Sequence, residues 1–221
     1  MKKARWFVLA GCLLSLLAVV PVSAAPVVLT FEGLKNQEQI LNYYDGGFGS
    51  LGSGPGPSYG IQFGSSALAL IDQDSGGTGN FANEPTSKTI AFFLSGGGLV
   101  MNVPAGFDTG FSFFYTSATA ASVTVYDGLD ATGNLLASLP LAAQYNIGCS
   151  GDPSGSYCNW TAVGVAFAGI ARSVNFAGGA DRTGYDNITL NSDVPVVPEP
   201  MTMLLMGPGV AAVALRRRTK R

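Results

Sequence analysis

The fold is decided most clearly by residues 110–126, which read GFSFFYTSATAASVTVY. In Phe111-Ser112-Phe113, and again in Val123-Thr124-Val125, apolar and polar side chains alternate with a period of two. Successive side chains of a β-strand point to opposite faces, so this period places the apolar set on one face. The stretch therefore predicts strands at 110–115 and 122–126.

The same pattern continues on both sides of this stretch, from residue 26 to residue 190. Short β-branched or aromatic runs are separated by clusters of Gly, Pro, Asn and Asp, which favour turns. Further strands are predicted at 27–31, 60–63, 67–71, 89–94, 99–103, 135–139, 161–167, 173–176 and 185–190. A helical period competes only at 37–44. So many short strands favour an all-β fold, an antiparallel β-sandwich of the jelly-roll type.

Composition narrows the class of function. The chain has 221 residues, of which 30 are Gly, 12 are Pro and none is His. Without His, catalytic sets of the Ser-His-Asp or Cys-His kind and His-ligated zinc or haem are excluded. The length fits one domain with two tails, and the 47% hydrophobic content argues against a disordered chain.

The charges are segregated along the chain. Eight of the 12 basic residues lie within the first five or the last six positions. Residues 26–195 hold the other four basic residues and 13 of the 14 acidic ones, so their formal charge is about −9. Such a body repels phosphate backbones, which argues against nucleic acid as a partner and favours hard cations such as calcium.

Residues 1–24 are predicted to be a secretory signal peptide containing an apolar helix. Basic residues within the first five positions precede an apolar run at 6–20, and small residues at 22–24 provide a cleavage site after Ala24. Signal peptidase and the export machinery are then partners. An alternative is a lipoprotein signal, because residues 9–12 read LAGC, although only a short apolar run precedes Cys12.

The C-terminal end has three parts in a fixed order. Pro198-Glu199-Pro200 is followed by an apolar run at 201–215 and then by a basic tail that includes Arg216, Arg217 and Arg218. A helix over the apolar run spans only about 22 Å, short of a hydrocarbon core of ~30 Å. The end is therefore either a poor membrane anchor with a positive-inside stop or a sorting signal read by a processing enzyme.

This tripartite order resembles the PEP-CTERM sorting signal of Gram-negative bacteria. The resemblance covers residues 195–221 and implies processing by an exosortase, a membrane-embedded cysteine protease. It also implies transient anchoring of the precursor in the inner membrane and association with exopolysaccharide at the cell surface or outside the cell. It concerns where the protein goes, not what its body does.

The body, residues 25–194, resembles the jelly-roll domains found upstream of such signals. The resemblance rests on residues 111–126, on FAGIARSV at 167–174 and on the closing YDNITL at 185–190. These domains are similar in outline to carbohydrate-binding modules. In related carbohydrate-binding sandwiches a calcium ion ties the first strand to the last, which implies Glu32 and Asp186 as metal ligands. The alternative is a solvated Glu32 and an Asp186 that fixes a strand-entry turn.

A second candidate for a cation site lies at Asp72 and Asp74. These two acids alternate just before the glycine-rich run at 76–80, and carboxylates beside such a bend can surround a hard cation. An ordinary solvated loop is the alternative for this segment.

Cys149 and Cys158 are predicted to form a disulfide. They lie nine positions apart in a polar loop of a chain that is predicted to enter an oxidising compartment. A redox-active pair is less well supported, because the spacing is not Cys-x-x-Cys and no basic residue lies nearby in the sequence.

Sugar-binding surfaces combine exposed aromatic rings with a few polar partners. One cluster of rings flanks the Gly-Pro-rich segment at 43–60 and another surrounds the cysteine loop. Either could be a stacking platform, and the alternative is that the rings pin long loops onto the core. The ligand-binding candidates are Tyr44, Tyr59 and Trp160.

The main functional hypothesis is an exported structural protein associated with exopolysaccharide. The alternative is a carbohydrate-binding module that is stabilised by calcium. A polysaccharide hydrolase would need two carboxylates facing each other at ~5–10 Å. The Glu residues of the body, Glu32, Glu38 and Glu84, lie in no recognisable catalytic motif, so the chain is predicted not to be an enzyme.

Overall fold

The computed structural model describes residues 25–147, 149–150 and 155–197. Each of the eleven predicted runs overlaps a strand, and one short 3-10 helix, η1 (Gln73–Ser75), follows the third. The strands are β1 (Val27–Leu29), β2 (Gln62–Phe63), β3 (Leu68–Ile71), β4 (Thr89–Phe92), β5 (Gly98–Phe107), β6 (Gly110–Ser117), β7 (Ala121–Tyr126), β8 (Leu135–Leu141), β9 (Thr161–Ala166), β10 (Ala171–Ala177) and β11 (Thr183–Leu190).

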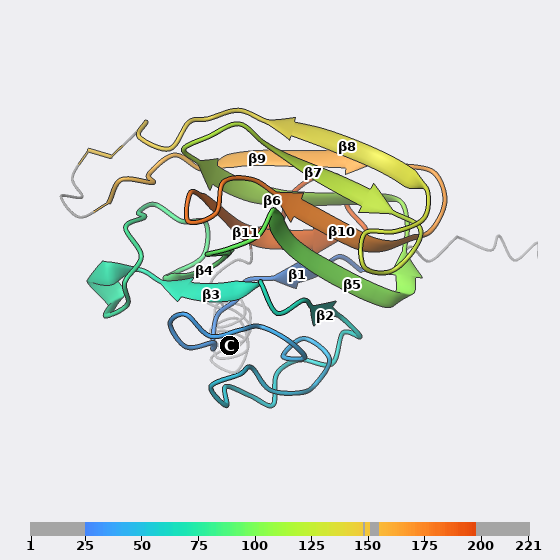
Figure 1. Ribbon diagram of the computed structural model, residues 1–221, viewed down its shortest axis with the longest axis horizontal. Coiled ribbons are helices and arrows are strands. Elements are labelled where there is room, and N and C mark those ends of the chain that lie inside the picture. The colour runs from blue at the N-terminus through green and yellow to red at the C-terminus, as the bar shows by residue number, and fades with distance from the viewer. Residues whose placement is uncertain (1–24, 148, 151–154, 198–221) are drawn as a thin grey trace, which may run out of the picture.

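The strands form two antiparallel sheets that pack as a sandwich (Figure 1). In the six-stranded sheet the order is β3-β4-β11-β6-β9, and β1 pairs with the second half of β11. In the five-stranded sheet the order is β2-β5-β10-β7-β8. Neighbouring strands are mostly distant in sequence, as in a jelly roll, so the predicted all-β antiparallel sandwich is confirmed.

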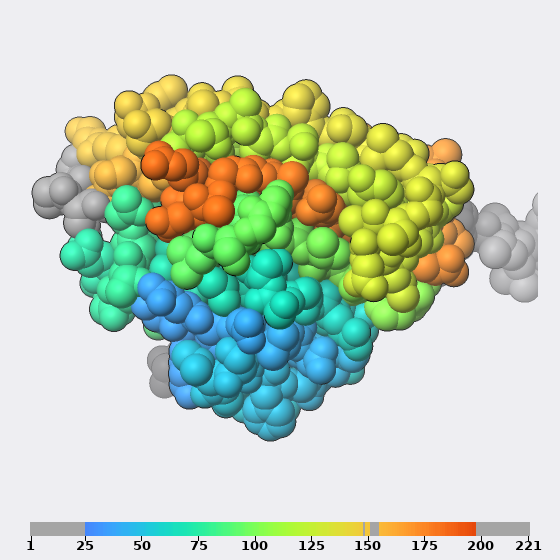
Figure 2. All heavy atoms as spheres, in the orientation of Figure 1, coloured from blue at the N-terminus to red at the C-terminus, as the bar shows by residue number. Residues whose placement is uncertain are grey.

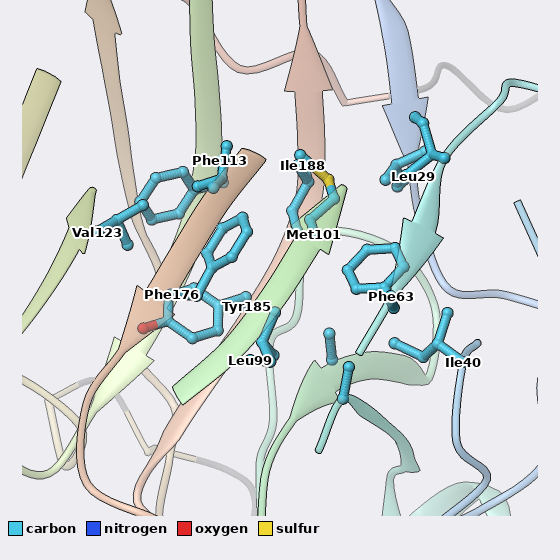
Figure 3. Close-up of a cluster of buried hydrophobic side chains, with 14 of the residues drawn as sticks. Leu29, Ile40, Phe63, Leu99, Met101, Phe113, Val123, Phe176, Tyr185 and Ile188 are labelled. Carbon is cyan, nitrogen blue, oxygen red and sulfur yellow. The ribbon is translucent and has the colours of Figure 1, made fainter. Parts of the chain in front are cut away.

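The core lies between the two sheets and is rich in aromatic rings (Figure 3). The alternation predicted along 110–126 is present, because Phe111 and Phe113 of β6 and Val123 of β7 are fully buried in this core. Phe176 of β10 packs against both Phe113 and Tyr185, with ring centroids 5.6 and 4.9 Å apart. Edge-to-face contacts of this kind add to the stabilisation from apolar burial.

Residues that follow β11 cover part of the outer face of the six-stranded sheet. Ser112 points away from the core, as its alternation with Phe111 requires, yet it is fully buried. Its hydroxyl donates to the carbonyl of Ser192 at 2.8 Å. The chain therefore leaves the sandwich across this face.

The helix that competes at 37–44 is absent, and residues 30–61 form a long loop (Figure 2, blue to cyan, bottom). Gln37 and Leu41 have φ angles of 59° and 46°, which a right-handed helix does not allow. Instead the buried carboxylate of Glu38 accepts the backbone N–H groups of Lys35, Leu51 and Ser53 at 2.7, 2.7 and 3.0 Å. Burial raises the pKa of Glu38, but these hydrogen bonds outweigh it and the pKa is lowered overall.

No helix in the described residues is long and apolar enough to span a membrane. The predicted signal helix at 1–24 and the segment at 198–221 lie outside the described residues.

Candidate functional site

Two loops meet at one end of the six-stranded sheet, at the left of Figure 1, and their residues line a pocket together with residues of that sheet. Ala91 of β4 lies in the main core, so its neighbours Ile90 and Phe92 point to the outer face of the sheet. Both are nevertheless buried. We call the covering segments, residues 80–83 and 155–160, the roof. A second and smaller apolar layer therefore lies between the roof and the sheet.

Main-chain and side-chain hydrogen bonds join the two halves of the roof. Phe81 and Tyr157 form a parallel β-bridge, and the N–H of Ala82 donates to the carbonyl of Tyr157 at 3.0 Å. The indole Nε1 of Trp160 donates to the carbonyl of Ala82, also at 3.0 Å. The Trp160 ring meets Phe81 edge-on, with centroids 6.2 Å apart. The roof is thus a built structure rather than two independent loops.

A disulfide between Cys149 and Cys158 closes the loop that carries Tyr157, and its Cα atoms lie 4.9 Å apart. Cys158 also donates its N–H to the carbonyl of Tyr145 at 2.8 Å. The rings of Tyr145 and Tyr157 pack 5.2 Å apart. The crosslink therefore constrains the position of Tyr157 in the roof.

A shallow pocket that is open to solvent lies where the roof meets the sheet. Its floor is apolar and includes Leu70 of β3 together with Ile90 and Phe92 of β4. Gly184 of β11 also lines it, and a Cβ atom at this position would lie 2.7 Å from Cδ1 of Ile90. Glycine therefore keeps this side of the floor open.

The rim of the pocket is polar and includes Asn80, Tyr157, Asp181 and Arg182. Burial raises the pKa of the Tyr157 hydroxyl, while the charge of Arg182 lowers it and that of Asp181 raises it. Within the described part of the chain the side chains of Asp181 and Arg182 form no ion pair or hydrogen bond. Both charged groups are therefore available to a ligand.

Glu32 and Asp186, the predicted metal ligands, are brought close together outside the pocket. Oε1 of Glu32 accepts the N–H of Thr89 at 2.9 Å, and Oδ2 of Asp186 accepts the N–H of Thr86 at 3.0 Å. Oδ1 of Asp186 also accepts the N–H of Asn187 at 2.7 Å. The charge of Glu32 contributes to raising the pKa of Asp186, which reflects their proximity.

Asp186 is completely buried, and this burial raises its pKa to about 8. The hydroxyl oxygen of Thr86 lies 3.1 and 2.9 Å from the two carboxylate oxygens of Asp186 and 3.0 Å from Oδ1 of Asn187. One hydroxyl has a single hydrogen, so it cannot satisfy three acceptors. A proton on Asp186 would resolve this, because the acid would then donate to Thr86 and Thr86 to Asn187. A turned Asn187 amide would resolve it as well, because its Nδ2, which has no hydrogen-bond partner, would then donate to Thr86.

The oxygen atoms of Glu32 and Asp186 also suit a hard cation such as calcium. A bound cation would neutralise the buried charge of Asp186 in place of the proton. In the described chain no group of three or more acidic or cysteine side chains is arranged to hold a metal. Calcium takes six to eight oxygens, so backbone carbonyls or water would complete its shell. The two carboxylates fit the ion but are only part of a site.

The other predicted cation site has a local structural role. Asp72 is buried before η1, and its Oδ1 accepts the N–H of Asp74 at 3.3 Å, which caps the helix. This contact accounts for the position of Asp72 without a cation.

The prediction that Tyr44 binds a ligand is wrong, because its side chain is only 3% exposed. Its hydroxyl accepts the N–H of Phe31 at 2.6 Å, and its ring anchors the long loop to the core. Tyr59 is 47% exposed and stacks on Tyr44 with centroids 6.3 Å apart. Trp160 is half-buried in the roof rather than displayed on a surface.

The remaining predicted site residues, Pro198, Glu199 and Pro200 of the sorting motif and Arg216, Arg217 and Arg218 of the tail, lie outside the described residues. Sequence reasoning missed Asp181 and Arg182 as site residues. The only available signal was that Arg182 is one of four basic residues in the body and directly follows an acid.

No protein-family model matches the chain, and no curated protein matches it significantly. Several solved structures are similar in architecture. The K2 cleaved adhesin domain of Lys-gingipain aligns over 75% of this chain and 99% of its own, with a TM-score of 0.46 and 11% identity. The carbohydrate-binding module TmCBM61, solved with β-1,4-galactotriose, aligns over 71% of this chain and 98% of its own, with a TM-score of 0.36 and 12% identity.

A carbohydrate-binding module from the Cellvibrio mixtus lichenase 5A, solved with cellotriose, aligns over 58% of this chain and 88% of its own. Its TM-score is 0.31 and its identity is 12%. These likenesses concern the fold alone.

Proposed function

We propose that this protein is a carbohydrate-binding β-sandwich without catalytic activity. The observation that carries the proposal is the pocket under the roof, which combines an apolar floor with a polar rim. The pocket is shallow and open to solvent, so it would contact one face or edge of a ligand rather than enclose it. A sugar ring has the matching character, since its C–H groups form an apolar face and its hydroxyl groups project from the edge.

The rim supports binding better than hydrolysis. Its carboxyl group is that of Asp181, whereas glycoside hydrolysis uses two carboxyl groups flanking the bond that is cleaved. Asp186 is buried, and its carboxylate is engaged by Thr86 and Asn187. The groups at the pocket can donate and accept hydrogen bonds, which is what recognition requires.

Glycan-array binding by the full chain tests this function, with Tyr157→Ala as the pocket variant and Tyr59→Ala as the matched control. Both substitutions remove a tyrosine from a loop, but only Tyr157 lines the pocket. We expect Tyr157→Ala to abolish binding and Tyr59→Ala to retain it. If no glycan binds, the proposal fails, and if only Tyr59→Ala loses binding, the site lies on the long loop instead.

A calcium ion held by Glu32 and Asp186 is proposed as a structural cofactor. Its charge would offset those of the two carboxylates and would tie the end of β1 to β11. The pair Thr86 and Thr89 would orient the carboxylates through the hydrogen bonds that they already donate. The ion is thus proposed to support the fold beside the pocket.

The protein is also proposed to be exported and to be sorted at the membrane by an exosortase, with exopolysaccharide as the material that it meets outside. The sorting motif and the signal peptide support this proposal, and the disulfide between Cys149 and Cys158 fits an oxidising compartment. Replacing Glu199 with Ala should leave an uncut, membrane-retained precursor, whereas Asp193→Ala should mature normally. Normal maturation of the Glu199→Ala protein would contradict the sorting proposal.

A further inference from the structure

We infer that the pocket selects a neutral sugar through two adjacent hydroxyl groups and discriminates against both acidic and amino sugars. This inference rests on the proposed carbohydrate-binding function and specifies its ligand class. The structural basis is the pair of opposite charges, Asp181 and Arg182, at the rim of a pocket with an apolar floor.

The two charged side chains at the rim offer complementary hydrogen-bonding groups. Asp181 and Arg182 are consecutive residues just before β11, both side chains are exposed, and within the described chain neither side chain has a protein partner. A carboxylate only accepts hydrogen bonds and a guanidinium only donates them. A hydroxyl group does both, so two neighbouring hydroxyls can donate to Asp181 and accept from Arg182. Charge-assisted hydrogen bonds of this kind are stronger than neutral ones.

A charged sugar would lie beside a like charge at the rim. A uronate carboxylate could pair with Arg182, but it would then lie beside the like charge of Asp181. An amino sugar could pair with Asp181 and would then lie beside Arg182. A neutral ligand can hydrogen-bond to both rim charges without adding a like charge.

The charge of the whole body acts in the same direction against acids. Residues 26–195 carry 13 acidic and four basic side chains. A field of this sign lowers the local concentration of anionic polysaccharides and slows their association. The acid is therefore rejected by both the rim and the surrounding surface.

The floor of the pocket and Tyr157 of the roof provide further contacts. The floor has no charged group, and its half-buried residue Leu70 offers an apolar contact, while Ile90 and Phe92 lie buried beside it. The hydroxyl of Tyr157 lies near both rim charges, because the charge of Arg182 lowers its pKa and that of Asp181 raises it. It supplies a third polar contact from the roof, so the ligand is held between the roof and the sheet.

Titration of the full chain with three matched series of methyl hexosides, followed by ligand-observed NMR, tests the inference. The series are neutral hexosides, the corresponding uronates and the corresponding 2-amino sugars. We expect the best neutral hexoside to bind at least tenfold more tightly than either charged counterpart, a difference on the order of one charge-assisted hydrogen bond. The uronate penalty should shrink when the salt concentration is raised, because salt screens the charge repulsion.

Single variants assign the effect to the rim. Arg182→Gln should weaken binding of the neutral hexoside by about tenfold. Asp181→Asn should reduce the discrimination against the uronate. The matched control is Arg172→Gln, an exposed arginine of β10 in the other sheet, which should change neither property.

The outcomes separate the inference from the function on which it rests. Equal or tighter binding of the uronate or the amino sugar, lost in Tyr157→Ala, overturns the neutral selection and leaves the carbohydrate-binding function intact. Binding of no hexoside in any series, together with a negative glycan array, removes the function itself.

Discussion

The Asp186→Asn substitution tests whether a buried acid is held in the protonated form. Asp186 is fully buried, and its pKa is raised to about 8 by that burial. The chain contains no His, so the side chains that usually titrate between pH 6 and pH 8 are absent. A change of stability within this window therefore reports mainly on Asp186.

The sign and size of the effect follow from proton linkage. The pKa of Asp186 is about 8 in the folded state, against 3.8 for an unperturbed Asp, so between these values the folded state binds a proton that the unfolded state lacks. The stabilisation is complete below the unfolded pKa and is lost as the pH rises through the folded pKa. The slope is about 1.4 kcal/mol per pH unit, so the free energy of unfolding should fall by about 2 kcal/mol between pH 6 and pH 8.

Urea unfolding at pH 6, 7 and 8 in the presence of EDTA measures this change. The asparagine amide introduced at this position cannot ionise but can still donate to the hydroxyl of Thr86, so Asp186→Asn should give a nearly flat profile. Asp193→Asn replaces an exposed acid and should keep the slope of the original protein. A flat profile in the original protein, or the same slope in Asp186→Asn, would show that Asp186 does not bind the proton.

Repeating the series with calcium tests the proposed ion separately. Calcium binds the ionised carboxylate, so it should stabilise the original protein more at pH 8 than at pH 6. It should have little effect on Asp186→Asn. If calcium leaves the original protein unchanged at every pH, the ion proposal fails while the pH prediction remains.

Three further predictions concern the loop, the roof and the core. Glu38→Gln removes the charged acceptor of three backbone N–H groups, so it should lower the free energy of unfolding by about 2 kcal/mol in urea titrations. An unchanged midpoint would contradict the anchoring role of Glu38. Replacing both Cys149 and Cys158 by Ser should lower the free energy of unfolding by about 2 kcal/mol. It should also weaken glycan binding, because the crosslink constrains Tyr157. Binding as tight as before would show that the roof does not need the crosslink. Phe176→Ala leaves a cavity between the sheets, so it should lower the free energy of unfolding, measured by calorimetry, by about 3–5 kcal/mol. A decrease below about 1 kcal/mol would contradict the packing of Phe176 between the sheets.

The strands could be predicted from the sequence because their signal is local. Alternation with a period of two follows from the covalent geometry of an extended chain. The sequence therefore shows that Phe111 and Phe113 share one face of a strand and that Ser112 lies on the other, whichever strands pair with it. Glycine and proline clusters mark the turns for the same reason. The two cysteines lie close enough in sequence for their pairing to be anticipated. The juxtaposition of Glu32 and Asp186 was anticipated from a resemblance and not from spacing.

What a face contacts is not a local property, because it depends on segments that are distant in the sequence. The segment at 37–44 has a helical period, but long-range hydrogen bonds to Glu38 hold it in turns. Tyr44 and Tyr59 lie in the same loop and have the same side chain, yet one anchors the core and the other faces solvent.

The pocket is the clearest case, because its parts come from segments far apart in the chain. Tyr157 reaches the rim through pairing with Phe81, and Arg182 reaches it at the entry to β11. Thr86 and Asp186, which are joined by hydrogen bonds, are 100 positions apart. The class of fold can be predicted from the sequence, since it depends on the pattern of residues along the chain. The site cannot, since it depends on which distant residues the two sheets and their loops bring together.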